Sequence, residues 1–404
     1  MPAQTGGSKS LLETFMKTWL CLLLAVTLAG CASTTQQRTV APAPPSVIAD
    51  SAFGPPAHPV QVDDLFAVSP AMREFLNTGR FRNAVKTKGV ELALAEALYR
   101  SDDLQLVYDT TITRNAADTF ATRSGNCLAL VIMTAAFAKE LGMQVTFQNV
   151  MIGDTWTRAD DLYLSNLHVN VMFSHNAHLS EVFSTAAPVI VDFVPPQDVM
   201  GFRTRRVPES MLVAMFLNNR AAEELSAGRV NDAYWWARKA VTEHPDFVTA
   251  FNTLGVIYQR RGEVQLAERS FKEALDRDPQ HIVAMYNLLA LLRAEHRTEE
   301  AELLAGRVKS IEKDPPFYFF EQGMDALNRG NFPVARAMFQ REVQRAPYYD
   351  EFHFWLGIAN LRLGDVKAAR QEMALAESTS STPEARRTYS AKLAHMRAMK
   401  GSDQ

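Results

Sequence analysis

A repeated spacing of about 34 residues is the feature of this sequence that most limits the folds it can adopt. Pro245, Pro279 and Pro347 are separated by one and then by two multiples of this spacing. The unit that begins at Val248 is the clearest, with small and aromatic residues at fixed points: Phe251, Leu254, Gly255, Tyr258, Ala267, Phe271 and Ala274. A period of this length predicts stacked pairs of helices, in which small residues let the helices approach and a proline ends the second one.

This pattern resembles the tetratricopeptide repeat. Neighbouring units keep the register through Ala221, Ala233, Ala240, Gly323, Ala335, Phe339, Gly357, Ala369 and Ala376. The unit from Ile282 departs from the pattern, because Leu289 replaces the glycine and Lys313 replaces the proline. We expect an all-α solenoid of about five repeats over residues 211–382, followed by a capping helix and tail at 383–404.

One row of residues within the repeats is a candidate binding surface. Its members recur at the same spacing as the prolines: Asn218, Asn252, Tyr286, Phe320 and Phe354. The family resemblance implies that they lie on the first helices, which line the concave face and bind an extended peptide or protein segment. For Phe320 and Phe354 packing between repeats is the simpler interpretation. The predicted peptide-binding residues are therefore Asn218, Asn252 and Tyr286.

The N-terminus has the order of an export signal. A basic start at Met16-Lys17 precedes an apolar run from Trp19 to Leu28, which is too short to span a membrane as a helix. The closing residues Leu28-Ala29-Gly30-Cys31 resemble the lipobox of bacterial lipoproteins. This resemblance implies cleavage before Cys31 and lipid attachment to its sulfur and its new amino group, which anchors a protein stably.

We accordingly interpret residues 1–31 as a lipoprotein signal segment that starts at Met16. Ala32 after the cysteine implies an envelope protein at the outer membrane, facing the periplasm. Residues 32–60 are rich in Pro, Ala, Ser and Thr, and we expect them to form a disordered tether. Of the three cysteines, Cys21 leaves with the signal and Cys31 carries lipid, so Cys127 remains as a free thiol in an oxidising compartment.

Composition and motifs exclude several classes of function. A net charge of -3 gives no general electrostatic reason to bind nucleic acid. No glycine pattern for phosphate or dinucleotide binding is present. His175 and His178 have a metal-like spacing but no further ligands nearby, and we interpret them as a loop. We therefore predict neither a cofactor nor a metal.

Cys127 is the candidate nucleophile. Ser124 or Asn126 can cap a helix that starts at the cysteine and continues through an apolar stretch to Leu141, with Gly142 as its stop. A thiol at a helix N-terminus is favoured as the thiolate, which is the form that attacks carbonyl carbon.

Two strand patterns supply candidate partners for the thiol. Apolar residues alternate with polar ones over residues 166–173, and His168 lies on the more polar side. A second strand at residues 188–194 carries Asp192 among apolar residues, where a carboxylate needs a partner. If the strands pair antiparallel, Asp192 can orient the imidazole of His168 toward Cys127.

These residues together resemble the transglutaminase-like superfamily of papain-like thiol enzymes. Gly125-Asn126-Cys127 before an apolar helix, His168 in a His-Val-Asn-Val strand and Asp192 in a Val-Asp-Phe strand occur in the family's order. The resemblance implies an α+β papain-like domain at residues 61–210, with Cys127 as nucleophile, His168 as base and then acid, and Asp192 as orienter. No Trp could be matched to the family's oxyanion donor, since Trp156 follows the cysteine. The backbone amide of Cys127 is our candidate.

Two functions compete at this stage. The first is a lipid-anchored thiol hydrolase or acyltransferase that acts on a peptide or protein amide and recruits its substrate through the repeats. A further possibility is that the amide belongs to the stem peptides of peptidoglycan. The second is a non-catalytic adaptor that scaffolds an envelope complex. In that case Cys127 is a small buried apolar residue, His168 a solvated strand residue and Asp192 a strand-end cap.

Overall fold

The computed structural model describes residues 45–99, 104, 106–109, 112–159, 162–174, 188–193, 203–311, 314, 317–347, 349–380 and 383–398. The predicted signal segment with Cys31 lies outside these residues, as do His175 and His178. Within the described part of the chain, no helix combines the length and the apolar character needed to cross a bilayer.

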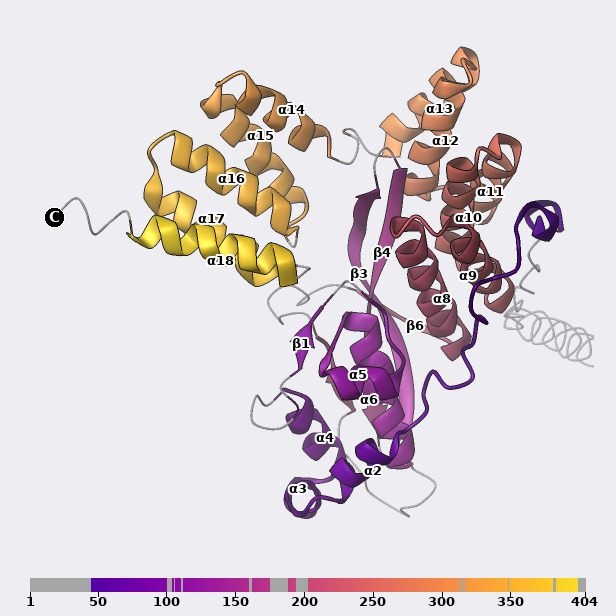
Figure 1. Cartoon of the computed structure of the whole chain (residues 1–404), viewed down its shortest axis with the longest axis vertical. Coiled ribbons are helices and arrows are strands. Elements are labelled where there is room, and N and C mark those ends of the chain that lie inside the picture. Colours follow the sequence, from indigo (N-terminus) through magenta and orange to yellow (C-terminus); the bar gives the residue numbers. More distant parts are fainter. Residues whose placement is uncertain are drawn as a thin grey trace, which may run out of the picture. The chain divides into compact units, whose positions relative to one another are not determined.

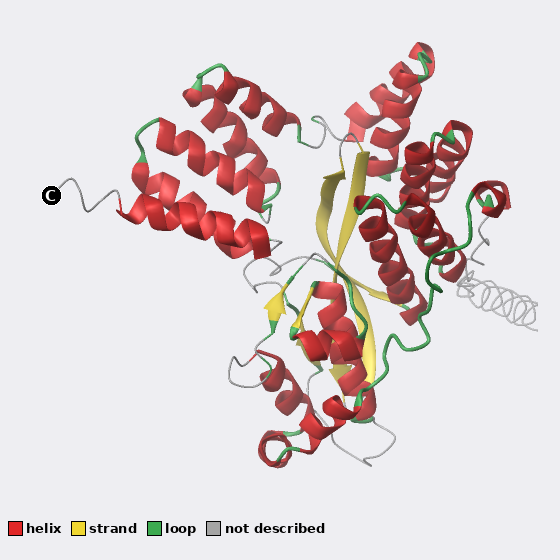
Figure 2. Ribbon diagram, in the orientation of Figure 1, coloured by secondary structure: helices red, strands yellow, loops and turns green. Residues whose placement is uncertain are grey.

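The first half of the described chain combines short helices with antiparallel strands (Figures 1 and 2). We call residues 60–207 the α/β part. Its elements are α2 (Pro70–Asn77), α3 (Gly79–Lys88), α4 (Val90–Tyr99), β1 (Val107–Tyr108), α5 (Ala116–Thr122), β2 (Ser124–Gly125), α6 (Cys127–Glu140), β3 (Gln144–Ala159), β4 (Leu162–Ser174), β5 (Val189–Val191) and β6 (Thr204–Val207).

A four-stranded sheet has the order β5–β4–β3–β6, and its neighbouring strands are antiparallel. The long β3–β4 hairpin changes register between Val150 and Thr155. Helix α6 packs against β3 and β4. Strand β5 pairs with β4 through Val191 opposite Val171, so the antiparallel pairing anticipated from the two strand patterns is present.

The second half consists of helix pairs, and the predicted repeat solenoid is confirmed. The first three pairs, which we call the first array, are α8 (Glu209–Ser226) with α9 (Val230–Glu243), α10 (Val248–Arg261) with α11 (Val264–Arg277), and α12 (Ile282–Ala294) with α13 (Thr298–Ile311). The remaining helices, which we call the second array, are α14 (Tyr318–Asn328), α15 (Phe332–Arg345), α16 (Asp350–Arg362), α17 (Val366–Thr379) and α18 (Pro383–Ala398).

The small residue of each repeat is needed for close packing. A Cβ added at Gly255 would lie 2.5 Å from the Phe271 ring, and one added at Gly323 would lie 2.5 Å from the Phe339 ring. In the third pair the corresponding residues are Leu289, which is buried in a hydrophobic core, and Ala305, which is partly buried against that core. The large side chain has therefore moved to the other helix of the pair, which explains how this unit keeps its fold without the glycine.

The hydrophobic cores divide the repeats into the two arrays. One core runs from Val47 through the α/β part to Val308 in α13, with no break near residue 210. A second core begins at Phe317, and a third joins α17 to α18. The first array is thus packed as one body of apolar side chains with the α/β part, whereas the second array has cores of its own.

Residues 47–57 differ from the predicted tether. We call them the N-terminal strap, because they lie against α9 and α10. The Phe53 ring stacks on Tyr234 with centroids 3.9 Å apart, and the Tyr258 hydroxyl donates to the carbonyl oxygen of Val47 over 2.8 Å. Both Val47 and Phe53 are buried.

Polar contacts also hold the strap. Asp50 pairs with Arg238 over 2.7 Å, and the Trp235 indole donates to the carbonyl oxygen of Gly54 over 2.6 Å. The prediction of a disordered tether over residues 32–60 is therefore wrong for the strap. The segment is rich in proline as described, but its few apolar side chains find a surface on the repeats, which offsets the cost of ordering it.

Candidate functional site

Cys127 is the first residue of α6. Asn126 caps this helix, and its side-chain oxygen accepts a hydrogen bond from the backbone N–H of Ala129 over 2.9 Å. The rest of the helix is anchored, since its residues from Leu128 to Ala138 are buried. Cys127 itself is partly exposed, and it is the free cysteine of the described residues. The N-terminal amides and the helix dipole favour a negative charge on its sulfur.

His168 and Asp192 meet between β4 and the end of β5. The Nε2 atom of His168 lies 2.7 Å from Oδ1 of Asp192. The other carboxylate oxygen accepts a hydrogen bond from the side-chain nitrogen of Asn170 over 3.1 Å. Because Asn170 follows His168 by two residues on β4, both donors lie on the same face of the strand. The carboxylate is therefore held at both oxygens.

The backbone of Asp192 is held from outside the sheet. The Tyr99 hydroxyl at the end of α4 donates to the carbonyl oxygen of Asp192 over 2.7 Å and accepts from its backbone N–H over 2.9 Å. Sequence reasoning assigned no role to Tyr99 or Asn170. The spacing of Asn170 from His168 was a usable signal, whereas nothing in the sequence relates Tyr99 to a residue 93 positions later.

The imidazole of His168 interacts with Cys127 as well as with Asp192. Burial alone would lower the pKa of His168, but hydrogen bonds with Asp192 and Cys127 outweigh burial and raise the pKa to about 10. The three predicted residues therefore interact at one place in the structure.

The segment before Cys127 is fixed by a short parallel pair of strands. Val107 pairs with Ser124, and Tyr108 pairs with Gly125. A Cβ at Gly125 would lie 2.8 Å from the Cβ of Ala129, so only glycine fits here without a shift of the helix.

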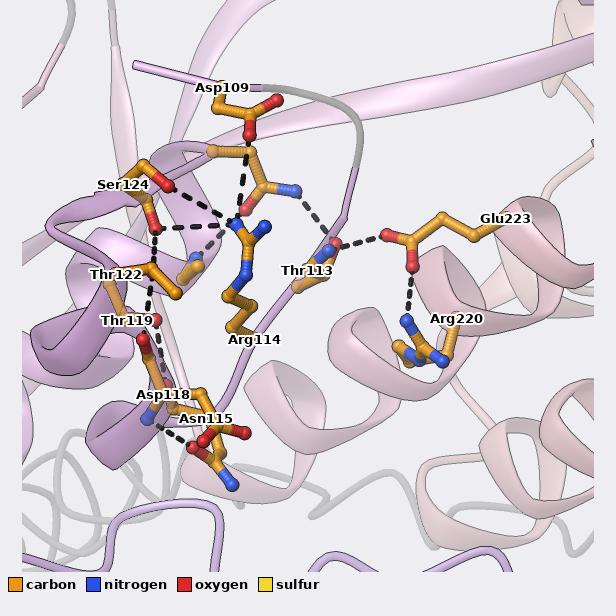
Figure 3. A network of polar contacts seen from close by, with 12 residues as sticks. Asp109, Thr113, Arg114, Asn115, Asp118, Thr119, Thr122, Ser124, Arg220 and Glu223 are labelled. Carbon is orange, nitrogen blue, oxygen red and sulfur yellow. Dashed lines mark hydrogen bonds and ion pairs between the residues drawn. The ribbon is translucent and has the colours of Figure 1, made fainter. Parts of the chain in front are cut away.

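A half-buried arginine supports the same segment. Arg114 lies 3.7 Å from a carboxylate oxygen of Asp109 and donates to the carbonyl oxygen of Ser124 over 3.4 Å (Figure 3). The guanidinium thus links the residue that follows β1 to the first residue of β2. Sequence reasoning missed it, because a lone arginine in a polar stretch carries no motif.

The residues predicted to bind a peptide are buried. Asn218, Asn252 and Tyr286 are 4%, 0% and 7% exposed, and the Asn287 side chain donates to Asn252 over 2.8 Å. Their helices α8, α10 and α12 lie against β3 and β4 of the same chain. The chain's own hairpin therefore covers this side of the first array. Peptide binding by these three residues stays a prediction.

The two phenylalanines of the row pack within the second array. Phe320 is buried against Phe339 and Phe352, as the packing interpretation predicts. Phe354 lies against Tyr389 of α18, with ring centroids 5.2 Å apart.

Comparisons with known proteins identify the repeats. The tetratricopeptide repeat family matches residues 320–385. Similar solved structures include YrrB, a TPR protein with an unusual peptide-binding site (17% identity, 44% of this chain and 92% of that chain, TM-score 0.24). TTC0263, a thermophilic TPR protein of Thermus thermophilus, shares 17% identity over 45% of this chain and 98% of its own, with a TM-score of 0.29.

MamA from Desulfovibrio magneticus RS-1 is 19% identical over 41% of this chain and 94% of its own, with a TM-score of 0.25. These structures are too distant to carry a function over to this chain. No curated protein sequence matches it. The C-terminal region therefore contains tetratricopeptide repeats, a module that in general binds proteins or peptides.

Proposed function

We propose that this chain is a thiol enzyme of transglutaminase-like, papain-like type that acts on an amide of a peptide or protein and recruits its substrate through its repeats. The observation that carries this proposal is the 2.7 Å contact between His168 and Asp192, with Cys127 interacting with the same imidazole from the start of a capped helix. An imidazole with a raised pKa beside a thiol and a carboxylate supports a reactive thiolate.

The groups have distinct tasks in this reaction. The Cys127 sulfur attacks the carbonyl carbon and forms a C–S bond, and the backbone amide of Cys127 is our candidate donor to the oxyanion. His168 then gives its proton to the leaving amine as the C–N bond breaks, while Asp192 keeps the ring in place. The thioester is released by water, which gives hydrolysis, or by another amine, which gives acyl transfer.

The proposal also includes the cellular location of the protein. We place the protein at the cell envelope, anchored at Cys31 to the outer membrane and facing the periplasm. The residues that support this are the basic and apolar run before Leu28-Ala29-Gly30-Cys31. Labelling of the expressed chain with a radioactive fatty acid, compared with Cys31→Ala, tests it.

The enzyme proposal is tested by the pH dependence of Cys127 alkylation with iodoacetamide, in a form that begins at Ala32. We expect the wild type to react near neutral pH much faster than a free thiol. His168→Ala should slow alkylation near neutral pH toward the rate of a free thiol, and Asp192→Ala should slow it less. A wild-type thiol that is inert, or that reacts alike in all three proteins, would overturn the proposal.

A non-catalytic adaptor is the second candidate, and the comparisons favour it because the family match falls on repeats alone. Both candidates require a protein or peptide partner. The two candidates predict different results for the substitution Cys127→Ser, which keeps a side chain of similar size. An adaptor should retain its whole cellular phenotype with this substitution, whereas an enzyme should retain partner binding and lose the phenotype.

A further inference from the structure

A chain of hydrogen bonds connects the first repeat helix to the cap of the Cys127 helix. Thr113 is its centre and is 2% exposed. Its hydroxyl oxygen accepts from the Asn126 side-chain nitrogen over 2.7 Å. Its backbone N–H donates to Glu223 of α8 over 2.6 Å, as Figure 3 shows. Thr113 thus connects a carboxylate on the repeats to the residue that precedes Cys127.

Both ends of the Asn126 amide are engaged. The oxygen caps α6 at Ala129, and the nitrogen is bonded to Thr113. Asn126 is buried, so loss of the Thr113 hydroxyl would leave its NH2 group without this partner and remove the contact that turns its oxygen toward the helix. The orientation of the cap therefore depends on Thr113.

Thr113 in turn is held by α8. Glu223 accepts from the Thr113 backbone with one oxygen and from Arg220 with the other, which is 2.6 Å from the guanidinium. Asn219 of the same helix also donates to the Thr113 hydroxyl, over 3.3 Å. Burial raises the pKa of Glu223, against its hydrogen bond with Thr113 and the charge of Arg220. A buried carboxylate is costly unless its partners are in place.

We infer that Thr113 and Glu223 are positioning residues of the thiol site, and that α8 of the repeats sets the geometry of the Cys127 helix through them. This inference rests on the proposed function for its chemical meaning. Its consequence is that a partner that shifts α8 changes the reactivity of the thiol, so that the repeats regulate the site as well as recruit the substrate.

The test compares three variants in the chain from Ala32 onward. Thr113→Val removes the hydroxyl at nearly constant volume, Thr113→Ser keeps it, and Glu223→Ala removes the carboxylate. Glu268→Ala is the matched control, since Glu268 pairs with Arg297 and Lys272 in the same array without contacting the α/β part in these pairs. Two quantities are measured: the pH profile of Cys127 alkylation and the hydrogen exchange rate of the Ala129 amide.

We expect Thr113→Val to accelerate exchange of the Ala129 amide roughly tenfold, because a helix cap is loosened, and to slow alkylation of Cys127 near neutral pH. Glu223→Ala should change both quantities in the same direction. Thr113→Ser and Glu268→Ala should match the wild type. A general loss of stability would not make Thr113→Val and Thr113→Ser differ in the pH profile of Cys127 alkylation.

The outcomes distinguish the two ideas. If the wild-type thiol is reactive but Thr113→Val and Glu223→Ala match it in both quantities, the positioning role is overturned and the enzyme proposal stands. If the wild-type thiol is inert, the enzyme proposal falls. Exchange of the Ala129 amide then still decides the positioning role, because it needs no reactive thiol.

Discussion

The two arrays are made of the same helix pair, yet the chain uses them differently. The first array shares one core with the α/β part, is covered by β3 and β4 at α8, α10 and α12, and binds the N-terminal strap. The second array closes its own cores, and the family match lies within it. One kind of repeat can therefore share a core with the rest of the chain or close cores of its own, depending on what packs onto it.

The largest expected effect comes from replacing the packed glycine by valine, once in the first array and once in the second. Gly255→Val and Gly323→Val each force a side chain into a phenylalanine ring, and each should lower the free energy of unfolding of its own array by about 3 kcal/mol. Only Gly255→Val should change the alkylation rate of Cys127 in moderate urea, because the first array shares its core with the α/β part. If Gly323→Val changes that rate equally, the arrays unfold as one unit and the comparison fails.

A second prediction concerns a buried charge in the second array. Nδ1 of His353 lies 2.7 Å from Glu372 and Nε2 lies 2.8 Å from the carbonyl oxygen of Pro347, so both nitrogens face acceptors. Burial lowers the pKa of His353, but these hydrogen bonds outweigh burial and raise it. The stabilisation should be fully present below the unfolded pKa of 6.5 and be lost as the pH rises through the folded value.

His353→Gln should therefore remove about 1.5 kcal/mol from the second array at pH 5.5 and less at high pH. Urea unfolding followed at several pH values measures this. The Cys127 alkylation profile serves as the control and should not change. A wild-type second array whose stability rises from pH 5.5 to pH 9 would contradict the prediction.

A smaller effect is expected at the strap of the first array. The pKa of Asp50 is lowered, chiefly by its hydrogen bond with Arg238. The stabilisation is therefore present above the unfolded pKa of 3.8 and is lost as the pH falls through the folded value. Asp50→Asn at pH 7 should cost about 1 kcal/mol or less, since the pair is largely exposed.

Limited proteolysis is the measurement for the strap. Cleavage within residues 47–57 should be faster in Asp50→Asn than in the wild type, while cleavage within the second array should be unchanged. Equal cleavage of the strap in both proteins would show that apolar contacts alone retain it.

The smallest effect is a gain. Gly306 in α13 has nothing within 4 Å of an added Cβ and lies inside the helix. Gly306→Ala should stabilise the first array by about 0.5–1 kcal/mol through helix propensity. Gly306→Ala is also the control for Gly255→Val, because a side chain added at Gly306 meets no neighbouring atom. A loss of stability would mean that this face of α13 is packed.

The repeats could be predicted because their period is local and is repeated along the chain. The sequence also identified Cys127 from its helix cap and His168 from strand alternation, since both signals come from neighbouring residues. The strap was missed, because its docking depends on a surface formed by residues far along the chain, such as Tyr234. The cover of β3 and β4 over the first array was missed for the same reason.

The supporting residues of the candidate site were beyond the reach of sequence reasoning. Thr113 and Glu223 are 110 residues apart, and neither belongs to a motif. A buried threonine and a glutamate on a repeat helix look like ordinary core and surface residues until the fold brings them together. Local patterns therefore located the candidate residues Cys127 and His168 but not the residues that support them.

The exchange of bulk between Gly255–Phe271 and Leu289–Ala305 has a consequence for building with these repeats. The helices of the third pair are matched to each other and not to those of the second pair. A hybrid of α12 with α11 would bring Leu289 against Phe271, and the reverse hybrid would leave a void between Gly255 and Ala305. These two repeats can therefore be exchanged for one another only as whole helix pairs.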